Sequence, residues 1–193
     1  MKRMAVFCGS SAGSDPVYAS EAYLLGKTLG LRKTGLVYGG ASVGLMGAVA
    51  DGVLSVGGEV IGIIPTFLKT KEIVHDGLTA LEVVDTMHQR KQRMSELSDG
   101  FIALAGGFGT LEEFFEVLTW GQLGLHTKPL GLLNTAGFYD GLIRFLDRAV
   151  SEGFLKAINR DMILVSDNTP SLLEKMEAYV PAPVGKWIRP SEV

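Results

Sequence analysis

Residues that bind metals or form disulfides are scarce in this chain. Its 193 residues include one cysteine, Cys8, and three widely spaced histidines. A single cysteine excludes a disulfide within the chain, and the spacing of these residues matches no zinc-site pattern. We therefore expect no metal centre, and the lone thiol favours a reducing compartment, which predicts a cytoplasmic protein.

The chain also has no excess of basic charge and no long apolar run. Its formal net charge is −3, whereas proteins that bind nucleic acids non-specifically usually carry a positive excess. The apolar run that starts at Met4 stops at Cys8, before a Gly-Ser turn, and is too short for a signal peptide. No stretch reaches membrane-spanning length. We expect neither a nucleic-acid partner nor a membrane partner.

What the sequence does contain is a regular alternation of short apolar runs and helical patterns. Apolar residues make up 47% of the chain and charged residues 20%, proportions typical of a globular protein with a sizeable core. The runs predict strands over 4–8, 35–38, 60–64, 80–84, 101–104, 129–133 and 162–165. The patterns predict a helix opened by Asp15-Pro16 and helices over 45–54, 86–99, 110–123, 139–151 and 171–179, with a loop and a short helix over 67–77.

Strands that are continuously apolar and separated by helices predict a sheet buried on both faces. We expect an α/β protein with a Rossmann-like, doubly wound, mostly parallel sheet and helices on both faces. This single domain would span residues 1–180, followed by an extended, proline-containing tail over 181–193. Ligands of such folds bind beyond the carboxyl ends of the strands, where three glycine-rich turns are expected, over 9–13, 39–44 and 106–109.

The turn Gly106-Gly107-Phe108-Gly109, between a predicted strand and a predicted helix, is the most informative of the three. Glycines let the backbone approach a ligand, and the free N–H groups and dipole of a helix start favour an anion such as phosphate. The turn lacks the Gly-Lys-Ser/Thr ending of a P-loop, and no Gly-x-Gly-x-x-Gly follows the first strand. In the other two turns, Ser10 and Gly40 are candidates for contact with the same ligand, although serine and glycine are also ordinary turn residues.

Glu113, just after this turn, has two interpretations. With Thr110 it fits a capping box, in which the glutamate reaches back to the threonine N–H, and this interpretation is favoured on the residues alone. Alternatively, the helix dipole keeps Glu113 ionised, so that it orients water or faces a developing positive charge. The neighbouring Glu112, Glu116 and Thr119 either line one wall of a cleft or form a solvated helix face.

Arg90 lies on the apolar face of the predicted helix 86–99, between Met87 and Met94. A guanidinium that points inward requires an anionic partner, which is either a structural carboxylate or a ligand, and the pattern favours neither. For the adjacent Lys91, a solvated position is favoured over a turn toward the same site.

Two segments resemble a known family. Met87-His88-Gln89-Arg90-Lys91 and the run from Gly106 to Glu113 are similar to the two signature motifs of the Lonely Guy family, often catalogued as "possible lysine decarboxylase". The similarity extends over nearly the whole chain, including Phe7-Cys8-Gly9-Ser10-Ser11. One departure is Ala105, which stands where the family motif usually has a proline that stiffens the turn.

The resemblance implies hydrolysis of the N-glycosidic bond of an adenine-type nucleoside 5′-monophosphate, giving the free base and ribose 5-phosphate. It implies Arg90 and Glu113 as the catalytic pair, no cofactor, and a homodimer. It implies that the residues contacting the nucleotide are Glu72, Lys91, Gly107, Phe108, Gly109, Thr110, Leu111, Glu112 and Thr119, to which the turn residues Gly106, Ser10 and Gly40 are added.

Two other classes of function stay open on the sequence. One is a carrier that binds a phosphorylated ligand such as molybdenum cofactor without cleaving it, which would not need the pair Arg90 and Glu113. The other is a dehydrogenase, which the glycine pattern does not favour. A lysine decarboxylase normally holds pyridoxal phosphate on a lysine, and nothing in the sequence marks such a lysine. The preferred base, plain adenine or an N6-prenylated form, is also left open.

Overall fold

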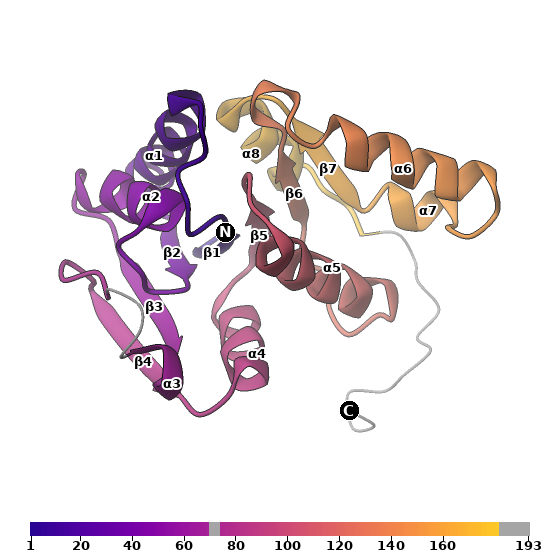
Figure 1. Ribbon diagram of the computed structural model, residues 1–193. Helices are drawn as coiled ribbons and strands as arrows, with labels where there is room; N and C mark the ends of the chain where they lie inside the picture. The colour runs from indigo at the N-terminus through magenta and orange to yellow at the C-terminus, as the bar shows by residue number, and fades with distance from the viewer. Residues whose placement is uncertain (70–73, 182–193) are drawn as a thin grey trace.

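The computed structural model describes residues 1–69 and 74–181. A seven-stranded sheet in the order β4-β3-β2-β1-β5-β6-β7 runs through the described chain, and every neighbouring pair is parallel (Figure 1). The strands are β1 Arg3–Phe7, β2 Gly35–Tyr38, β3 Val60–Pro65, β4 Ala80–Val84, β5 Gly100–Ala103, β6 Leu130–Leu133 and β7 Ile163–Ser166. The predicted fold class is confirmed.

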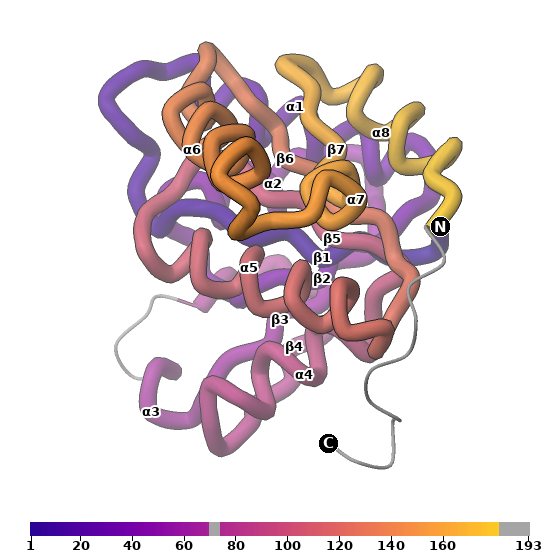
Figure 2. Tube along the Cα trace, turned by 90° about the vertical axis from the view of Figure 1, so that its right-hand side faces the viewer, coloured from indigo at the N-terminus to yellow at the C-terminus, as the bar shows by residue number. Residues whose placement is uncertain are grey.

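Helices cover both faces of the sheet. They are α1 Pro16–Leu31, α2 Gly44–Leu54, α3 Thr66–Lys69, α4 Met87–Leu97, α5 Phe108–Gln122, α6 Asp140–Ser151, α7 Ala157–Arg160 and α8 Thr169–Glu177, with a 3-10 turn over Thr135–Gly137. Figure 1 shows α1, α2 and α8 on one side of the sheet and α5 and α6 on the other. Figure 2 views the molecule from the second side, where α4, α5 and α6 pass in front of the strands.

Alternate residues of each strand point into two separate apolar cores, as the pleat requires. From β1, Met4 and Val6 pack with α1, α2 and α8, whereas Ala5 and Phe7 pack with α4, α5 and α6. Burial on both faces is why these strands read as continuous apolar runs rather than as alternating ones.

The strand order creates the site. The chain builds β1 to β4 outward in one direction, then returns through α4 to place β5 on the free side of β1. The reversal opens a crevice beyond the carboxyl ends of β1 and β5, where ligands of doubly wound sheets bind. Residues 87–91 follow the carboxyl end of β4 and residues 106–113 follow the carboxyl end of β5, so both segments lie at this edge of the parallel sheet.

Most differences from the predicted elements are shifts of one to three residues at element ends. The shift that matters most is that of the helix predicted over 110–123, which begins two residues earlier, at Phe108. Residues 182–193, nearly all of the predicted tail, lie outside the described residues. Within the described ranges, no helix combines the length and apolar character needed to cross a bilayer, and no three His, Cys, Asp or Glu side chains gather as a metal site would require.

Candidate active site

Three turns pack against one another at the carboxyl edge of the sheet. The N–H of Gly9 donates to the carbonyl of Ala105 at 3.0 Å, and the N–H of Leu45 donates to the carbonyl of Gly9, also at 3.0 Å. Gly44 has a φ of +58°, and a Cβ there would stand 2.3 Å from the carbonyl carbon of Ser10. The β1, β2 and β5 turns are therefore fixed relative to one another by backbone contacts.

A cavity of about 370 Å³ opens at this edge, within the size range of small-molecule sites. It is lined by Gly9, Ser10, Ser11, Ala12, Gly13, Tyr18, Leu45, Ala105, Gly106, Gly107 and Phe138. The first and third glycine-rich turns thus face a common space, as the sequence predicted for turns at the ends of neighbouring strands.

The capping-box interpretation of Glu113 is wrong. Helix α5 has Gly107 as its N-cap, and no side chain caps it. Thr110 lies inside the first turn, buried, with its Oγ1 so close to Gly106 that a Cβ on that glycine would be 2.1 Å away. The glycines let the helix start two residues earlier than the threonine pattern indicates. The N–H groups of the first turn are therefore not capped by a side chain.

Arg90 is buried at the end of β2. Its side chain extends from α4, whose N-cap is Thr86, and only 6% of the residue is exposed. A Cβ on Gly39 would lie 2.0 Å from its Nη2, so the guanidinium occupies space that only glycine leaves open. Nη1 lies 3.9 Å from the sulfur of Met87.

The Arg90 guanidinium has no anionic partner in the described part of the chain. Its Nε is buried without a hydrogen bond, and no carboxylate of residues 1–69 or 74–181 comes within ion-pair distance. A buried charge left unpaired is costly, so a structural ion pair within these ranges does not explain it. What remains is a cation available to an anionic ligand.

The carboxyl group of Glu113 lies in the same environment. Burial raises its pKa above the usual range, and the charge of Arg90 is the strongest influence in the opposite direction. Burial also raises the pKa of the Cys8 thiol at the end of β1, which Glu113 raises further and Arg90 lowers. All three groups therefore interact across the crevice, at the meeting point of α4, α5 and β1.

The predicted solvated position of Lys91 is wrong. Lys91 is buried, and its Nζ lies 2.5 Å from Oε1 of Glu112 and 2.9 Å from Oε2 of Glu116. Burial alone would lower the pKa of this lysine, but the hydrogen bond to Glu112 and the ion pair with Glu116 together outweigh that effect and raise it. Glu112 and Glu116 therefore connect α5 to α4 through Lys91, a role that neither interpretation, a solvated face or a cleft wall, includes.

The other predicted contacts are distributed unevenly. Gly107, Phe108 and Gly109 are exposed at the mouth of the site, Phe108 by 94%. Leu111, on α5, packs against the core, and the exposed Thr119, further along the same helix, donates to the carbonyl of Phe115 at 2.7 Å.

Three predicted contacts lie elsewhere on the chain. Ser10 lines the cavity, and Gly40 is buried at a φ of +84° close to Gly62. Glu72 lies outside the described residues. Sequence reasoning missed Gly39 as a site residue, since only its contact with Arg90 distinguishes it from other turn glycines.

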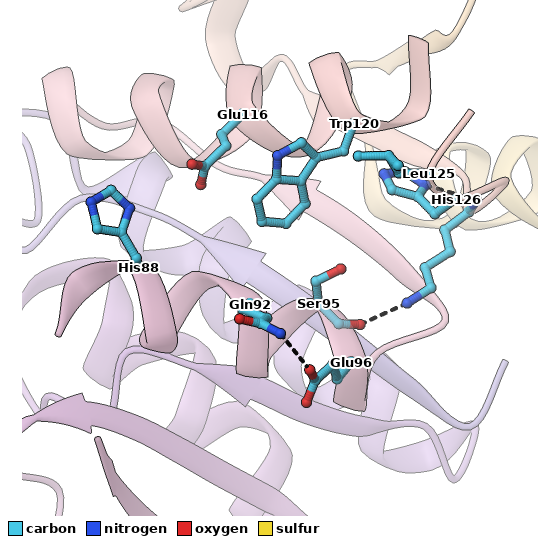
Figure 3. A pocket seen from close by; sticks show the side chains of 9 residues that line it. His88, Gln92, Ser95, Glu96, Glu116, Trp120, Leu125 and His126 are labelled. Atoms are coloured by element: carbon cyan, nitrogen blue, oxygen red, sulfur yellow. Dashed lines mark hydrogen bonds between the residues drawn. The ribbon is translucent and has the colours of Figure 1, made fainter. Parts of the chain in front are cut away.

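A second cavity, of about 650 Å³, lies between α4 and α5 (Figure 3). It is lined by His88, Gln92, Ser95, Glu96, Glu116, Trp120, Leu125, His126 and Lys128. In Figure 3, Glu116 and Trp120 project from α5 toward α4, with His88 facing them. We call this space the α4–α5 groove.

Fold and site together define a class of protein. The described chain is a Rossmann-like α/β protein with an uncapped helix start, a buried unpaired arginine and a half-buried carboxylic acid at the ligand-binding edge of its sheet. These features suit a ligand that carries a phosphate and undergoes acid–base chemistry beside it.

Comparison with known proteins identifies the family. A family model described as "possible lysine decarboxylase" matches residues 46–176. A probable cytokinin riboside 5′-monophosphate phosphoribohydrolase of Oryza sativa subsp. japonica is 50% identical over 93% of this chain and 79% of its own length. A cytokinin riboside 5′-monophosphate phosphoribohydrolase of Arabidopsis thaliana is also 50% identical, over 93% of this chain and 84% of its own. The chain belongs to this family, the Lonely Guy family that its two motifs resemble.

Solved structures agree on the fold. A molybdenum cofactor binding protein from Rippkaea orientalis superimposes with a TM-score of 0.70 at 24% identity, covering 92% of this chain and 97% of that chain. The Moco carrier protein from Chlamydomonas reinhardtii gives a TM-score of 0.69 at 20% identity, covering 91% and 95%. At these identities the likeness concerns the arrangement of helices and strands alone.

Proposed function

We propose that this protein hydrolyses the N-glycosidic bond of adenine-type nucleoside 5′-monophosphates, releasing the free base and ribose 5-phosphate. The observation that carries the proposal is the buried, unpaired guanidinium of Arg90 within the electrostatic range of the half-buried carboxyl group of Glu113. A protein that only carries a ligand needs no such pair. The names of the relatives that are 50% identical to the chain support the same reaction.

In this proposal the start of α5 holds the substrate phosphate. The N–H groups after Gly107 are free of side-chain caps and meet the dipole end of the helix. Holding the phosphate there fixes C1′ of the ribose relative to the catalytic groups. Around this point we place Ser10, Gly40 and residues 106–112 as nucleotide contacts, and Glu72, Lys91 and Thr119 stay predictions of the same kind.

Cleavage of the glycosidic bond passes through an oxocarbenium-like state, as in other glycoside hydrolysis. We assign ionised Glu113 to the positive ring and to the attacking water, because a carboxylate can both stabilise the cation and accept the proton. We assign Arg90 to the charge that develops on the departing base, since the helix start already supplies donors for the phosphate.

The reaction is tested by incubating the pure protein with AMP and separating the products by chromatography. The proposal requires adenine and ribose 5-phosphate in equal amounts. If neither AMP nor isopentenyladenosine monophosphate releases its base, the protein is not a hydrolase of this class. Tight binding of the intact nucleotide without cleavage would favour a carrier instead.

We predict that N6-prenylated AMP is the better substrate. The relatives are named for cytokinin riboside 5′-monophosphates, and burying a five-carbon apolar tail should raise kcat/KM at least about tenfold over AMP, since one methylene group alone discriminates by that order. Parallel initial-rate measurements on the two nucleotides check this. Equal or lower kcat/KM for the prenylated form would assign the enzyme to AMP turnover.

We further propose that residues 1–180 act as one domain of a cytoplasmic homodimer. All seven strands of the described chain share one sheet, and a single cysteine is the usage favoured in a reducing compartment. The α4–α5 groove supports self-association, because Trp120 and Leu125 line it beside the site (Figure 3). Aromatic residues in such positions are typical anchors of interfaces.

The dimer proposal predicts the effect of Trp120→Ala. The wild type should give the mass of a dimer by light scattering, and the variant should shift toward the monomer. Phe145→Ala is the matched control, because that ring is exposed on α6, away from the groove. A monomeric wild type, or a variant as dimeric as the wild type, would contradict the proposal.

A further inference from the structure

Lys91 is neutralised from the opposite helix by two carboxylates of unequal exposure. Its own side chain is 7% exposed, that of Glu112 is 55% exposed, and that of Glu116 is 24% exposed. Because a buried ammonium group must be paired, Lys91 depends on these two partners. The more buried partner, Glu116, has no place in the reaction described above.

Lys91 and its two carboxylate partners lie next to the proposed catalytic residues in the sequence and in the fold. Lys91 directly follows Arg90 on α4, and Glu112 directly precedes Glu113 on α5. Glu116 lies one turn beyond Glu112, on the side of α5 that faces α4 (Figure 3). The lysine and its two partners therefore join the helices at the level of the proposed catalytic pair.

Glu112 and Glu116 differ in what else they are able to do. Glu112 belongs to the first turns of α5 near the mouth of the site, where a bound nucleotide would compete for it. Glu116 lies deeper, lines the α4–α5 groove and keeps Oε2 on the Lys91 ammonium at 2.9 Å. Glu116 is therefore the partner of Lys91 that lies further along α5 from the proposed nucleotide site.

We propose that Glu116 is a positioning residue, which acts through Lys91 to hold Arg90 and Glu113 in register across the crevice. The inference rests on the proposed function. Bound to Glu116, Lys91 fixes α4 against α5, and α4 in turn keeps the Arg90 guanidinium at the end of β2.

This role has an electrostatic signature that a purely mechanical contact would lack. The charges that act on Glu113 are those of Arg90 and Lys91 from α4 and of Glu112 and Glu116 from α5, and Glu113 in turn acts on the thiol of Cys8, just after β1. The carboxylate of Glu116 raises the pKa of Glu113, and Lys91 lowers it. Removing the charge of Glu116 should therefore lower the pKa of Glu113.

The test is Glu116→Gln, which keeps the shape and removes the charge. We expect kcat to fall roughly 10- to 100-fold with little change in KM, the loss typical of misplaced catalytic groups, and the acid limb of the pH–rate profile to move to lower pH. Carboxyl-carbon NMR titration of Glu113 in the wild type and the variant should show the same downward shift without any turnover. Glu96→Gln is the control, because that exposed acid on α4 pairs with Arg93 instead.

A double-mutant cycle completes the experiment. If Glu116 acts through Lys91, Glu116→Gln should add no further loss of kcat in a Lys91→Met background. Wild-type kcat and an unmoved Glu113 titration in Glu116→Gln would overturn the inference, as would full additivity. Should Glu116→Gln unfold by circular dichroism, Glu116→Asp takes its place. If the wild type cleaves no nucleotide, the proposed function is wrong. The NMR titration still shows whether Glu116 changes the pKa of Glu113, because it needs no turnover.

Discussion

Glu113→Gln should reduce kcat for nucleotide hydrolysis by roughly 10²- to 10⁴-fold, the usual contribution of a positioned acid–base group. The amide keeps the size of the side chain but can neither become a carboxylate nor accept the proton of water. Its neighbours Phe114 and Val117 already anchor α5 in the core, so the variant should fold normally. Steady-state rates on AMP, with circular dichroism of the same sample, measure both effects.

The pH dependence gives this prediction a direction. Because burial raises the pKa of Glu113, and ionised Glu113 is the proposed active form, the wild-type rate should rise with pH through a value above the ordinary carboxyl range. The Glu113→Gln variant should lack this rise of the rate with pH. Arg90→Ala should lose activity to a similar degree, but its remaining rate should still rise with pH, because Glu113 is still present. Normal turnover by folded Glu113→Gln would remove Glu113 from the mechanism.

Gly39→Ala should reduce kcat nearly as much as Arg90→Ala, although residue 39 carries no chemistry. A Cβ at this position would stand 2.0 Å from Nη2 of Arg90 and 3.2 Å from the sulfur of Met46. The backbone there needs no left-handed conformation, so the added methyl group acts by displacing the guanidinium. We expect a loss of roughly 100-fold, the effect of a misplacement of about 1 Å, measured as kcat on AMP.

Gly141→Ala is the matched control for that substitution. Gly141 lies in the first turn of α6, and nothing lies within 4 Å of a Cβ built on it. Alanine there should leave activity unchanged and stabilise the helix by up to about 1 kcal/mol. If Gly39→Ala were as active as Gly141→Ala, Arg90 would not need its observed position.

The fold could be predicted from the sequence because short apolar runs and helical patterns alternate along nearly the whole described chain. Each of the seven strands is a short apolar run, and two of them, 35–38 and 80–84, match the structure residue for residue. The start of α5 was predicted less well, because a local sequence motif indicated the wrong N-cap. At residue 110, the threonine pattern pointed to a cap, but the glycines before it let the helix begin two residues earlier.

From the sequence we could predict which face of a helix, or which edge of the sheet, a site residue occupies, but not which side chains it contacts. Helical spacing put Arg90 on an inward face, but whether a carboxylate met it depended on the packing of α4 against β2. Lys91 shows the same limit more clearly, since its burial comes from Glu112 and Glu116 on a helix more than twenty residues away. Pairings between helices depend on the strand order, which no local pattern encodes.

The central claim is that the guanidinium of Arg90 and the acid at position 113 surround a single mononucleotide. It is tested most directly by a crystal structure of the folded Glu113→Gln variant with AMP bound. We predict the phosphate on the N–H groups that follow Gly107, with C1′ between the amide at 113 and Arg90. A nucleotide bound elsewhere on the molecule, or one whose C1′ lies out of reach of both side chains, would contradict the account.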